Sequence, residues 1–295
     1  MTVERAAGVG PAKIDVVYER IGDQGATPVV LVMGGTAQLI HWNDDFCGLL
    51  AARGFEVIRF DNRDAGLSTH FTSAPPVDFQ AAMRGDVSTV PYSLSDMAAD
   101  TVGLLDVLGI ASAHFVGASQ GGMIAQVIAV EHPARIRSLV SMMSTPRVAQ
   151  PSPEVMAKVF SGGYPTAREE AADRRIAMLA VAGSPAYPYD EAHARAVAMR
   201  AFDRDHDLPS VVRQSAAVLK SGDRTASLRA VRCPTLVVHG LADALCPPQY
   251  GRETAAAIPG AELVEIEGMG HDLPRQLYPR IVELIATTVA RGERA

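Results

Sequence analysis

The chain contains few cysteines, no dense cluster of basic residues and no long apolar run, and each absence excludes a class of protein. Its three cysteines, Cys47, Cys233 and Cys246, are widely separated and form no C-x-x-C pair. This pattern argues against a disulfide framework and against a zinc site. We therefore expect neither a metal nor another cofactor, and we interpret the cysteines as small hydrophobic residues in a reducing cytoplasm.

Acidic residues outnumber basic ones, 33 to 27, which gives a net charge of −6 at neutral pH. A chain with this balance and no basic run is not expected to bind nucleic acid or an anionic membrane surface. No apolar run approaches the roughly 20 residues that span a bilayer, and the first residues carry no secretory signal. We expect a cytoplasmic protein with no membrane partner, and its oligomeric state stays open.

With 295 residues, 48% of them hydrophobic, the chain can form one large domain or one domain with an insertion. Short apolar runs alternate with helical patterns, and several runs are continuously apolar, which is typical of strands covered by helices on both faces. The sequence therefore predicts a doubly wound, mostly parallel α/β sheet. The expected strands cover residues 16–18, 28–33, 55–60, 113–116, 136–143, 234–239 and 261–266, and the expected helices cover 42–53, 93–108, 121–132 and 276–289.

This alternation is interrupted in residues 146–229, where no run resembles a strand. Because strand signals resume afterwards, we interpret this segment as a helical cap inserted into a core formed by residues 1–145 and 230–295. Open α/β sheets bind ligands beyond the carboxyl ends of their strands, which is where such a cap belongs. A separate helical domain is the alternative. The helices expected in the cap are 153–160, 167–180, 190–202 and 209–220.

The segment Gly117-Ala118-Ser119-Gln120-Gly121 has the pattern G-x-S-x-G between an expected strand and an expected helix. This context indicates a nucleophile elbow, a sharp turn that lifts the serine hydroxyl clear of the sheet. The two glycines allow the strand and the helix to approach closely. We therefore predict that Ser119 is a catalytic nucleophile.

A catalytic serine needs a base to accept its proton and an acidic group to orient that base. In this fold the order along the chain is serine, then acid, then histidine. Asp243 follows one expected strand, and His271 follows the next in a loop with two glycines. We predict that His271 is the base and that Asp243 orients it. We interpret Asp272 as a helix-start residue and His239 as a hydrogen-bonded structural histidine.

Acyl transfer also requires backbone N–H groups that stabilise the developing oxyanion. We expect one from Gln120, at the start of its helix, where the N–H groups are free. We assign the second to Gly35, although a simple Gly-Gly turn is an alternative. The predicted substrate pocket consists of Gly34, His41 and Trp42, and the alternative for the last two residues is that they begin a helix.

Several segments resemble the α/β-hydrolase superfamily over nearly the whole chain. Residues 61–68 fit the D-x-R-x-x-G-x-S turn of these proteins, residues 131–140 resemble the segment after the elbow helix, and residues 268–271 resemble the histidine loop. The segments at 31–35, 57–61 and 266–271 are similar to the aclacinomycin methylesterase group, enzymes that cleave a methyl ester on polyketide antibiotics.

This resemblance implies the same site: Ser119 as nucleophile, Asp243 and His271 as its partners, and Gly35 and Gln120 as oxyanion donors. Gln120 stands where the group commonly has methionine. Because the cap sets substrate choice and none of it matches the group, the antibiotic ester is not implied for this chain.

These observations predict a serine carboxylic-ester hydrolase that cleaves a small or medium ester through an acyl-enzyme. A methylesterase is one possible form of this enzyme. A lactonase, a C–C bond hydrolase or a perhydrolase would use the same triad and is an alternative. Serine at the elbow argues against dehalogenases and epoxide hydrolases, which use aspartate. A non-catalytic ligand receptor is an alternative from a different class, since fold alone does not fix function.

Overall fold

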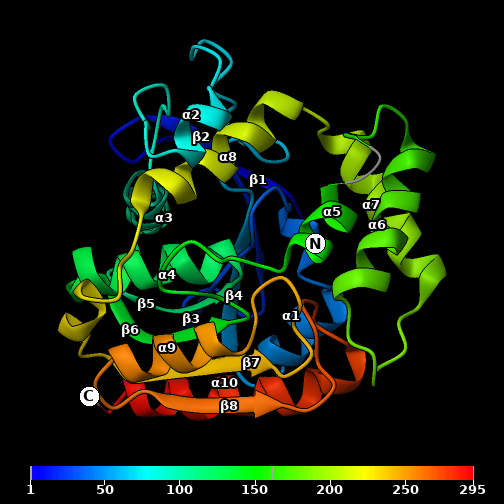
Figure 1. Cartoon of the computed structure of the whole chain (residues 1–295). Helices are drawn as coiled ribbons and strands as arrows, with labels where there is room; N and C mark the ends of the chain where they lie inside the picture. The colour runs from blue at the N-terminus through cyan, green and yellow to red at the C-terminus, as the bar shows by residue number, and fades with distance from the viewer. Residues whose placement is uncertain (1, 161–162, 295) are drawn as a thin grey trace.

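The computed structural model describes residues 2–160 and 163–294 and has an eight-stranded sheet at its centre (Figure 1). The strand order is β1-β2-β4-β3-β5-β6-β7-β8. All pairings from β4 to β8 are parallel, whereas β1 and β2 are antiparallel to their neighbours. The predicted fold class is therefore confirmed. The strands are β1 (Glu4–Val9), β2 (Ile14–Ile21), β3 (Thr27–Val32), β4 (Phe55–Phe60), β5 (Ala113–Ala118), β6 (Ile136–Met142), β7 (Thr235–Gly240) and β8 (Glu262–Ile266).

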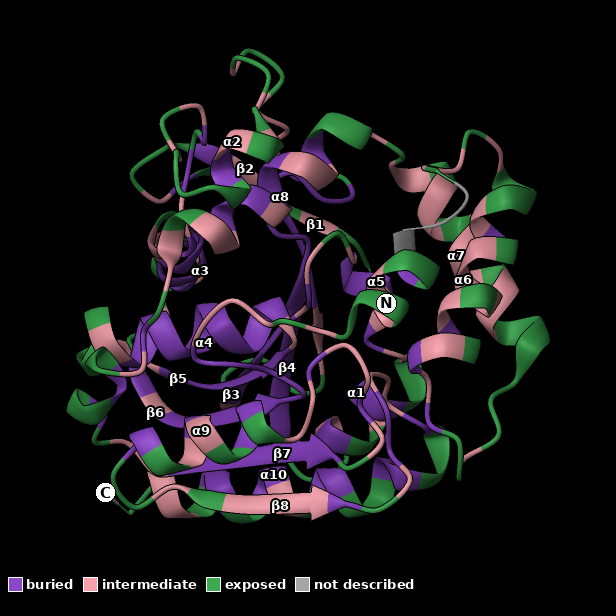
Figure 2. Ribbon diagram, viewed as in Figure 1, coloured by how far each residue is buried: buried purple, intermediate pink, exposed green. Residues whose placement is uncertain are grey.

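Every residue of β4, β5 and β7 is buried, as expected of strands covered by helices on both faces, and β4 buries Glu56 and Arg59 together with its apolar residues (Figure 2). Strand β1 was not expected, because its sequence contains two charged residues, two alanines and a glycine. It pairs with β2 at the edge of the sheet, where four of its six residues are not buried and strong apolar character is not required.

Helices cover both faces of the sheet and form two hydrophobic cores with it (Figure 2). Helices α3 and α4 pack on one face, and α1 and α10 pack on the other. None of the helices in the described part of the chain is long and apolar enough to cross a membrane. The core helices are α1 (Asp44–Ala51), α2 (Phe79–Met83), α3 (Leu94–Val107), α4 (Gln120–Glu131), α9 (Gln249–Ala257) and α10 (Tyr278–Gly292), of which α2 and α9 were not expected.

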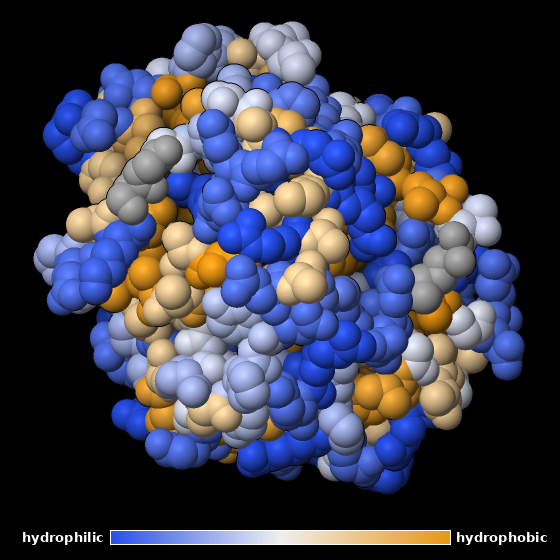
Figure 3. Space-filling model, turned by 90° about the vertical axis from the view of Figure 1, so that its right-hand side faces the viewer, coloured by the Kyte–Doolittle hydropathy of each residue, from blue (hydrophilic) through white to orange (hydrophobic). Residues whose placement is uncertain are grey.

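The α-helices that the structure describes between β6 and β7 are α5 (Pro153–Phe160), α6 (Arg168–Ala182), α7 (Glu191–Arg204) and α8 (Leu208–Ser221). They agree with the expected helices to within two residues at each end. Helices α6 and α7 pack against each other at one side of the molecule, whereas α8 packs on α2 and α3 (Figure 1). The side that carries α6 and α7 is largely hydrophilic, with separate small apolar patches (Figure 3).

Helix α4 approaches the sheet closely because two positions in the elbow are glycine. A Cβ atom at Gly121 would lie 2.0 Å from the carbonyl oxygen of Val32, and one at Gly117 would lie 2.2 Å from the carbonyl oxygen of Gly121. Both distances are far below van der Waals contact and both collisions involve backbone atoms. A larger residue at either position would therefore push α4 away from β3 and β5.

We expect Gly121→Ala to lower the free energy of unfolding by about 3 kcal/mol or more, since the added methyl group overpacks a backbone contact that cannot relax locally. Gly48→Ala is the matched control, because a Cβ at Gly48 in α1 would have no heavy atom within 4 Å. There alanine should stabilise the protein by about 0.5–1 kcal/mol. Urea denaturation of both variants measures the difference, and equal stabilities would contradict it.

Candidate active site

Ser119 lies between the end of β5 and the first residue of α4 and has a strained backbone, with φ of 54° and ψ of −123°. A non-glycine residue in this conformation costs about 1–3 kcal/mol, which the surroundings must offset. Strand β6 and the residues after it supply that support. The N–H of Ser119 donates to the carbonyl oxygen of Met142 at 2.9 Å, and the Ser144 hydroxyl donates to the carbonyl oxygen of Ser119 at 2.7 Å.

The structure brings Ser119, His271 and Asp243 into one hydrogen-bonded chain. His271 Nε2 lies 3.0 Å from Ser119 Oγ, and His271 Nδ1 lies 2.8 Å from Asp243 Oδ2. A carboxylate can only accept a hydrogen bond, so Nδ1 carries the proton in the neutral ring and Nε2 has a free lone pair toward the serine hydroxyl. This arrangement can remove the proton from Ser119 and return it to a leaving group.

The loops that carry His271 and Asp243 hold these side chains firmly. Asp243 Oδ1 accepts hydrogen bonds from the N–H groups of Leu245 and Cys246 at 2.9 and 2.7 Å, which fixes the carboxylate in the turn after β7. The N–H of His271 donates to the carbonyl oxygen of Ala182, the last residue of α6, at 2.6 Å. The loop of the histidine is therefore attached to the helices between β6 and β7.

The interpretation of Asp272 as a helix-start residue is wrong. The next helical turn begins at Arg275, after Pro274, and Asp272 instead accepts a short hydrogen bond from the Ser184 hydroxyl. Burial raises the pKa of this carboxyl. Its partner is 88 residues away in the chain, so no local sequence pattern could have identified it.

His239 is buried and hydrogen-bonded, as the sequence interpretation held. Its Nε2 lies 2.7 Å from the carbonyl oxygen of Cys246, and burial lowers the pKa of the ring. The same ring also lies beside Asp243, with Nε2 3.7 Å from Asp243 Oδ2. His239 therefore forms part of the support of the acidic residue.

Gly35 and Gln120 come together beside Ser119. A Cβ atom at Gly34 would lie 3.1 Å from Ser119 Cβ, and one at Gly35 would lie 2.5 Å from Gln120 Oε1, so both glycines allow the loop to contact the elbow. Within residues 2–160 and 163–294, the backbone N–H groups of Gly35 and Gln120 donate no hydrogen bond. Two free donors beside a serine hydroxyl are the features that an oxyanion hole requires.

The two other residues predicted for the pocket differ in their surroundings. His41 ends a 3₁₀ turn, and its Nδ1 lies 3.1 Å from the carbonyl oxygen of Gln38. Burial, followed by the positive charge of Arg175, lowers the pKa of His41 to about 4, so its ring is neutral at pH 7. Trp42 is 1% exposed and stacks on Phe46 in the core, instead of facing an accessible cavity.

All three cysteines are free thiols. Burial raises the pKa of Cys47 to about 12 and that of Cys233 to about 11, and it also raises the pKa of Cys246. Thiols in this state are protonated at neutral pH and are poor nucleophiles. Within the part of the chain that the structure describes, no three histidine, cysteine, aspartate or glutamate side chains gather as metal ligands.

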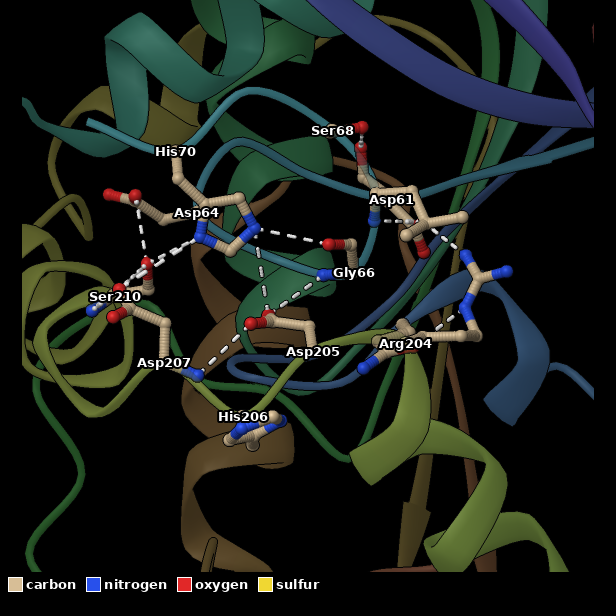
Figure 4. Close-up of polar contacts among 12 residues, drawn as sticks. Asp61, Asp64, Gly66, Ser68, His70, Arg204, Asp205, His206, Asp207 and Ser210 are labelled. Atoms are coloured by element: carbon tan, nitrogen blue, oxygen red, sulfur yellow. Dashed lines mark hydrogen bonds and ion pairs between the residues drawn. The ribbon is translucent and has the colours of Figure 1, made fainter. Parts of the chain in front are cut away.

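The turn at residues 61–70 joins the α7–α8 junction to the core (Figure 4). Asp61 pairs with Arg204 at the end of α7, and the N–H of Gly66 donates to Asp205 Oδ2 at 3.0 Å. His70 Nδ1 lies 2.8 Å from the hydroxyl oxygen of Ser210, in the first turn of α8. The D-x-R-x-x-G-x-S segment thus bonds the junction of α7 and α8 to the core of the protein.

Asp64 is a second buried acidic group of this junction. Arg213 donates to both of its carboxylate oxygens, at 2.7 and 2.8 Å, and the Tyr92 hydroxyl donates to Oδ2 at 2.7 Å. Burial opposes ionisation of Asp64, but these bonds and one from the N–H of Phe71 outweigh it and lower the pKa. No local sequence pattern could have identified Arg213, which is 149 residues away.

Comparisons with known proteins agree with the resemblance seen in the sequence. The chain matches the family model described as alpha/beta hydrolase fold over residues 27–274. It is 28% identical to the rhodomycin D methylesterase DnrP of Streptomyces peucetius, in an alignment that covers 94% of each chain. Its structure is similar to that of the enol-lactonase from Burkholderia xenovorans LB400, with 25% identity, a TM-score of 0.72, and 98% of this chain and 99% of that chain covered. A hydrolase from Pseudomonas aeruginosa PA01 is 24% identical with a TM-score of 0.71, over 100% of this chain and 99% of that chain.

We expect Asp64→Asn to lower the free energy of unfolding by about 3 kcal/mol at pH 7, because it leaves the buried Arg213 with only the partly exposed Asp207, 3.4 Å away, as a counter-charge. The pKa of Asp64 is lowered in the folded protein, so its stabilisation is complete above the ordinary value of 3.8 and is lost as the pH falls below it. The difference between the two proteins should therefore shrink only below that pH.

Urea denaturation at pH 7 and at several acidic pH values measures this difference. Glu154→Gln, which removes an exposed ion pair with Lys158, is the control and should leave the unfolding midpoint unchanged. A deficit that is as large at pH 3 as at pH 7 would contradict the assignment to the Asp64 charge.

Proposed function

The chain belongs to the α/β-hydrolase fold family, and we propose that it is a serine hydrolase of carboxylic esters. The observation that carries this proposal is the hydrogen-bonded chain from Ser119 through His271 to Asp243. The strained elbow and the two free N–H groups beside it support the same activity. A receptor that only bound a ligand would not need these features to coincide.

In the proposed reaction His271 Nε2 accepts the proton of Ser119 as Oγ attacks the ester carbonyl carbon. The carbonyl oxygen becomes an oxyanion and accepts hydrogen bonds from the N–H groups of Gly35 and Gln120. His271 then protonates the departing alcohol, which leaves an acyl group on Ser119. A water molecule, activated by the same imidazole, hydrolyses this acyl-enzyme, and Asp243 stabilises the imidazolium in both steps.

We favour a methyl ester as the substrate, because the rhodomycin D methylesterase of Streptomyces peucetius aligns with this chain over nearly the whole length of both. A lactone is the second candidate, supported by the similarity to the enol-lactonase from Burkholderia xenovorans. Both are carboxylic esters and require the same serine chemistry. Hydrolysis of a panel of methyl esters and lactones distinguishes them by their values of kcat/KM.

We further propose that residues 146–229 form a cap over this site and that residues 1–145 and 230–295 form the core. Two contacts support this division. The end of α6 holds the histidine loop through Ala182, and α8 contacts the loop of Gly35. Gly34 and His41 are the proposed core residues of the pocket, whereas the burial of Trp42 argues against its inclusion.

Ser119→Ala should lower kcat for p-nitrophenyl acetate and butyrate by at least about 10³-fold, because the nucleophile is absent. Ser95→Ala, at a serine on α3 that bonds to Glu131, should retain full activity. Mass spectrometry after treatment with a serine-directed phosphonate should find one adduct, on Ser119. If the wild-type protein shows neither turnover nor an adduct, the proposed function is wrong.

Asp243→Asn should lower kcat by about 10⁴-fold with little change in KM, since asparagine favours the wrong imidazole tautomer. Asp272→Asn, next to His271, is a matched control, because the Asp272 carboxyl bonds to Ser184 and not to the imidazole. Its kcat should fall less than about tenfold. Steady-state kinetics on p-nitrophenyl acetate compares them. A larger loss in Asp272→Asn than in Asp243→Asn would show that the acidic residue is misassigned.

A further inference from the structure

The loop that carries Gly35 contains a residue in an unfavourable conformation. Thr36 has φ of 62°, in the left-handed region, which is costly for a β-branched residue. Its N–H donates to the side-chain Oε1 of Gln214, on α8, at 2.6 Å. A contact from outside the loop therefore supports the backbone conformation directly beside the proposed oxyanion donor.

The side chain of Gln214 is fixed by a second hydrogen bond. Its Nε2 donates to the carbonyl oxygen of Arg63 at 2.6 Å, and the residue as a whole is 1% exposed. Since Thr36 offers a donor and Arg63 an acceptor, only one orientation of the amide satisfies both. Gln214 thus bridges the loop and the turn after β4 from a single buried position.

Gln214 also contacts the second proposed oxyanion residue. The Nε2 of Gln120 donates to the backbone carbonyl oxygen of Gln214 at 2.9 Å, while Gln120 Oε1 lies against Gly35. Gln120 therefore connects the elbow to α8. One residue of α8 holds both sides of the oxyanion hole.

Helix α8 is attached to the core along its length, which keeps Gln214 in place. Arg213 pairs with Asp64 near the middle of the helix, and Ser221 Oγ accepts from the N–H of Leu94 at 2.8 Å at its end. Figure 1 shows α8 beside α2 and α3, away from α6 and α7. The position of Gln214 therefore depends on the contacts between α8 and the core.

We propose that Gln214 is a positioning residue that holds the loop of residues 34–36 in the conformation of the oxyanion hole. This inference rests on the proposed serine hydrolase function and adds a requirement to it: α8 must be docked for the site to stabilise an oxyanion. The side chain of Gln214 acts through the N–H of Thr36, and its backbone carbonyl oxygen holds Gln120.

Gln214→Leu removes all side-chain hydrogen bonds at nearly the same volume. We expect kcat for p-nitrophenyl acetate to fall by about 10–100-fold, somewhat less than for complete loss of an oxyanion donor, with KM changed by less than about threefold. Binding of a trifluoromethyl ketone that mimics the tetrahedral intermediate should weaken in the same proportion as kcat/KM. Ser215→Ala, at the next residue of α8, removes only a bond within the helix and should change neither value.

Active sites are counted by the end point of phosphonate labelling, so that misfolded protein does not lower the apparent kcat. If Gln214→Leu does not fold, Gln214→Asn tests the same step, because its shorter amide cannot reach both Thr36 and Arg63. Thr36→Gly supplies a separate test. Glycine adopts φ of 62° without strain, so Gln214→Leu should cost at least threefold less activity in that background than in the wild type.

Unchanged kcat per active site in Gln214→Leu, or reduced kcat with unchanged affinity for the ketone, would overturn this inference while leaving the serine hydrolase proposal intact. An equal loss in the Thr36→Gly background would also overturn it, since the residue would then act by some route other than the loop. Absence of any turnover and adduct in the wild-type protein would overturn both proposals.

Discussion

Helix α4 begins in backbone contact with strands β3 and β5, because Gly117 and Gly121 place no side chain between them. That contact forces the chain to turn sharply at Ser119 and gives the serine its positive φ. It also brings the first turn of α4, with its free N–H groups, next to the loop after β3. The proposed nucleophile and both proposed oxyanion donors therefore depend on one close approach of helix and sheet.

The two other proposed catalytic groups reach Ser119 because of the strand order. Ser119, Asp243 and His271 follow β5, β7 and β8, and the carboxyl ends of these parallel strands lie along one edge of the sheet. Each side chain is then oriented by its own turn, as the two N–H bonds to Asp243 Oδ1 illustrate. Helices α6 and α8 contribute bonds to the loops of His271 and Thr36, so the insertion takes part in positioning the site.

The parts of this arrangement that were predictable are those with a local pattern. The G-x-S-x-G segment and the order of serine, acid and histidine led to three side chains that the structure brings together, and apolar runs located seven of the eight strands. Strand β1 was missed because an edge strand does not need apolar residues. Gln214 and the partner of Asp272 were missed because their roles arise from contacts across 178 and 88 residues, which leave no trace in the neighbouring sequence.

A crystal structure of the protein after reaction with a serine-directed phosphonate tests the central claim most directly. We predict a bond between phosphorus and Ser119 Oγ, with a phosphonyl oxygen about 3 Å from the backbone nitrogens of Gly35 and Gln120. We also predict that His271 stays bonded to Asp243. An adduct on another residue, or a phosphonyl oxygen that points away from both nitrogens, would contradict this view of the site.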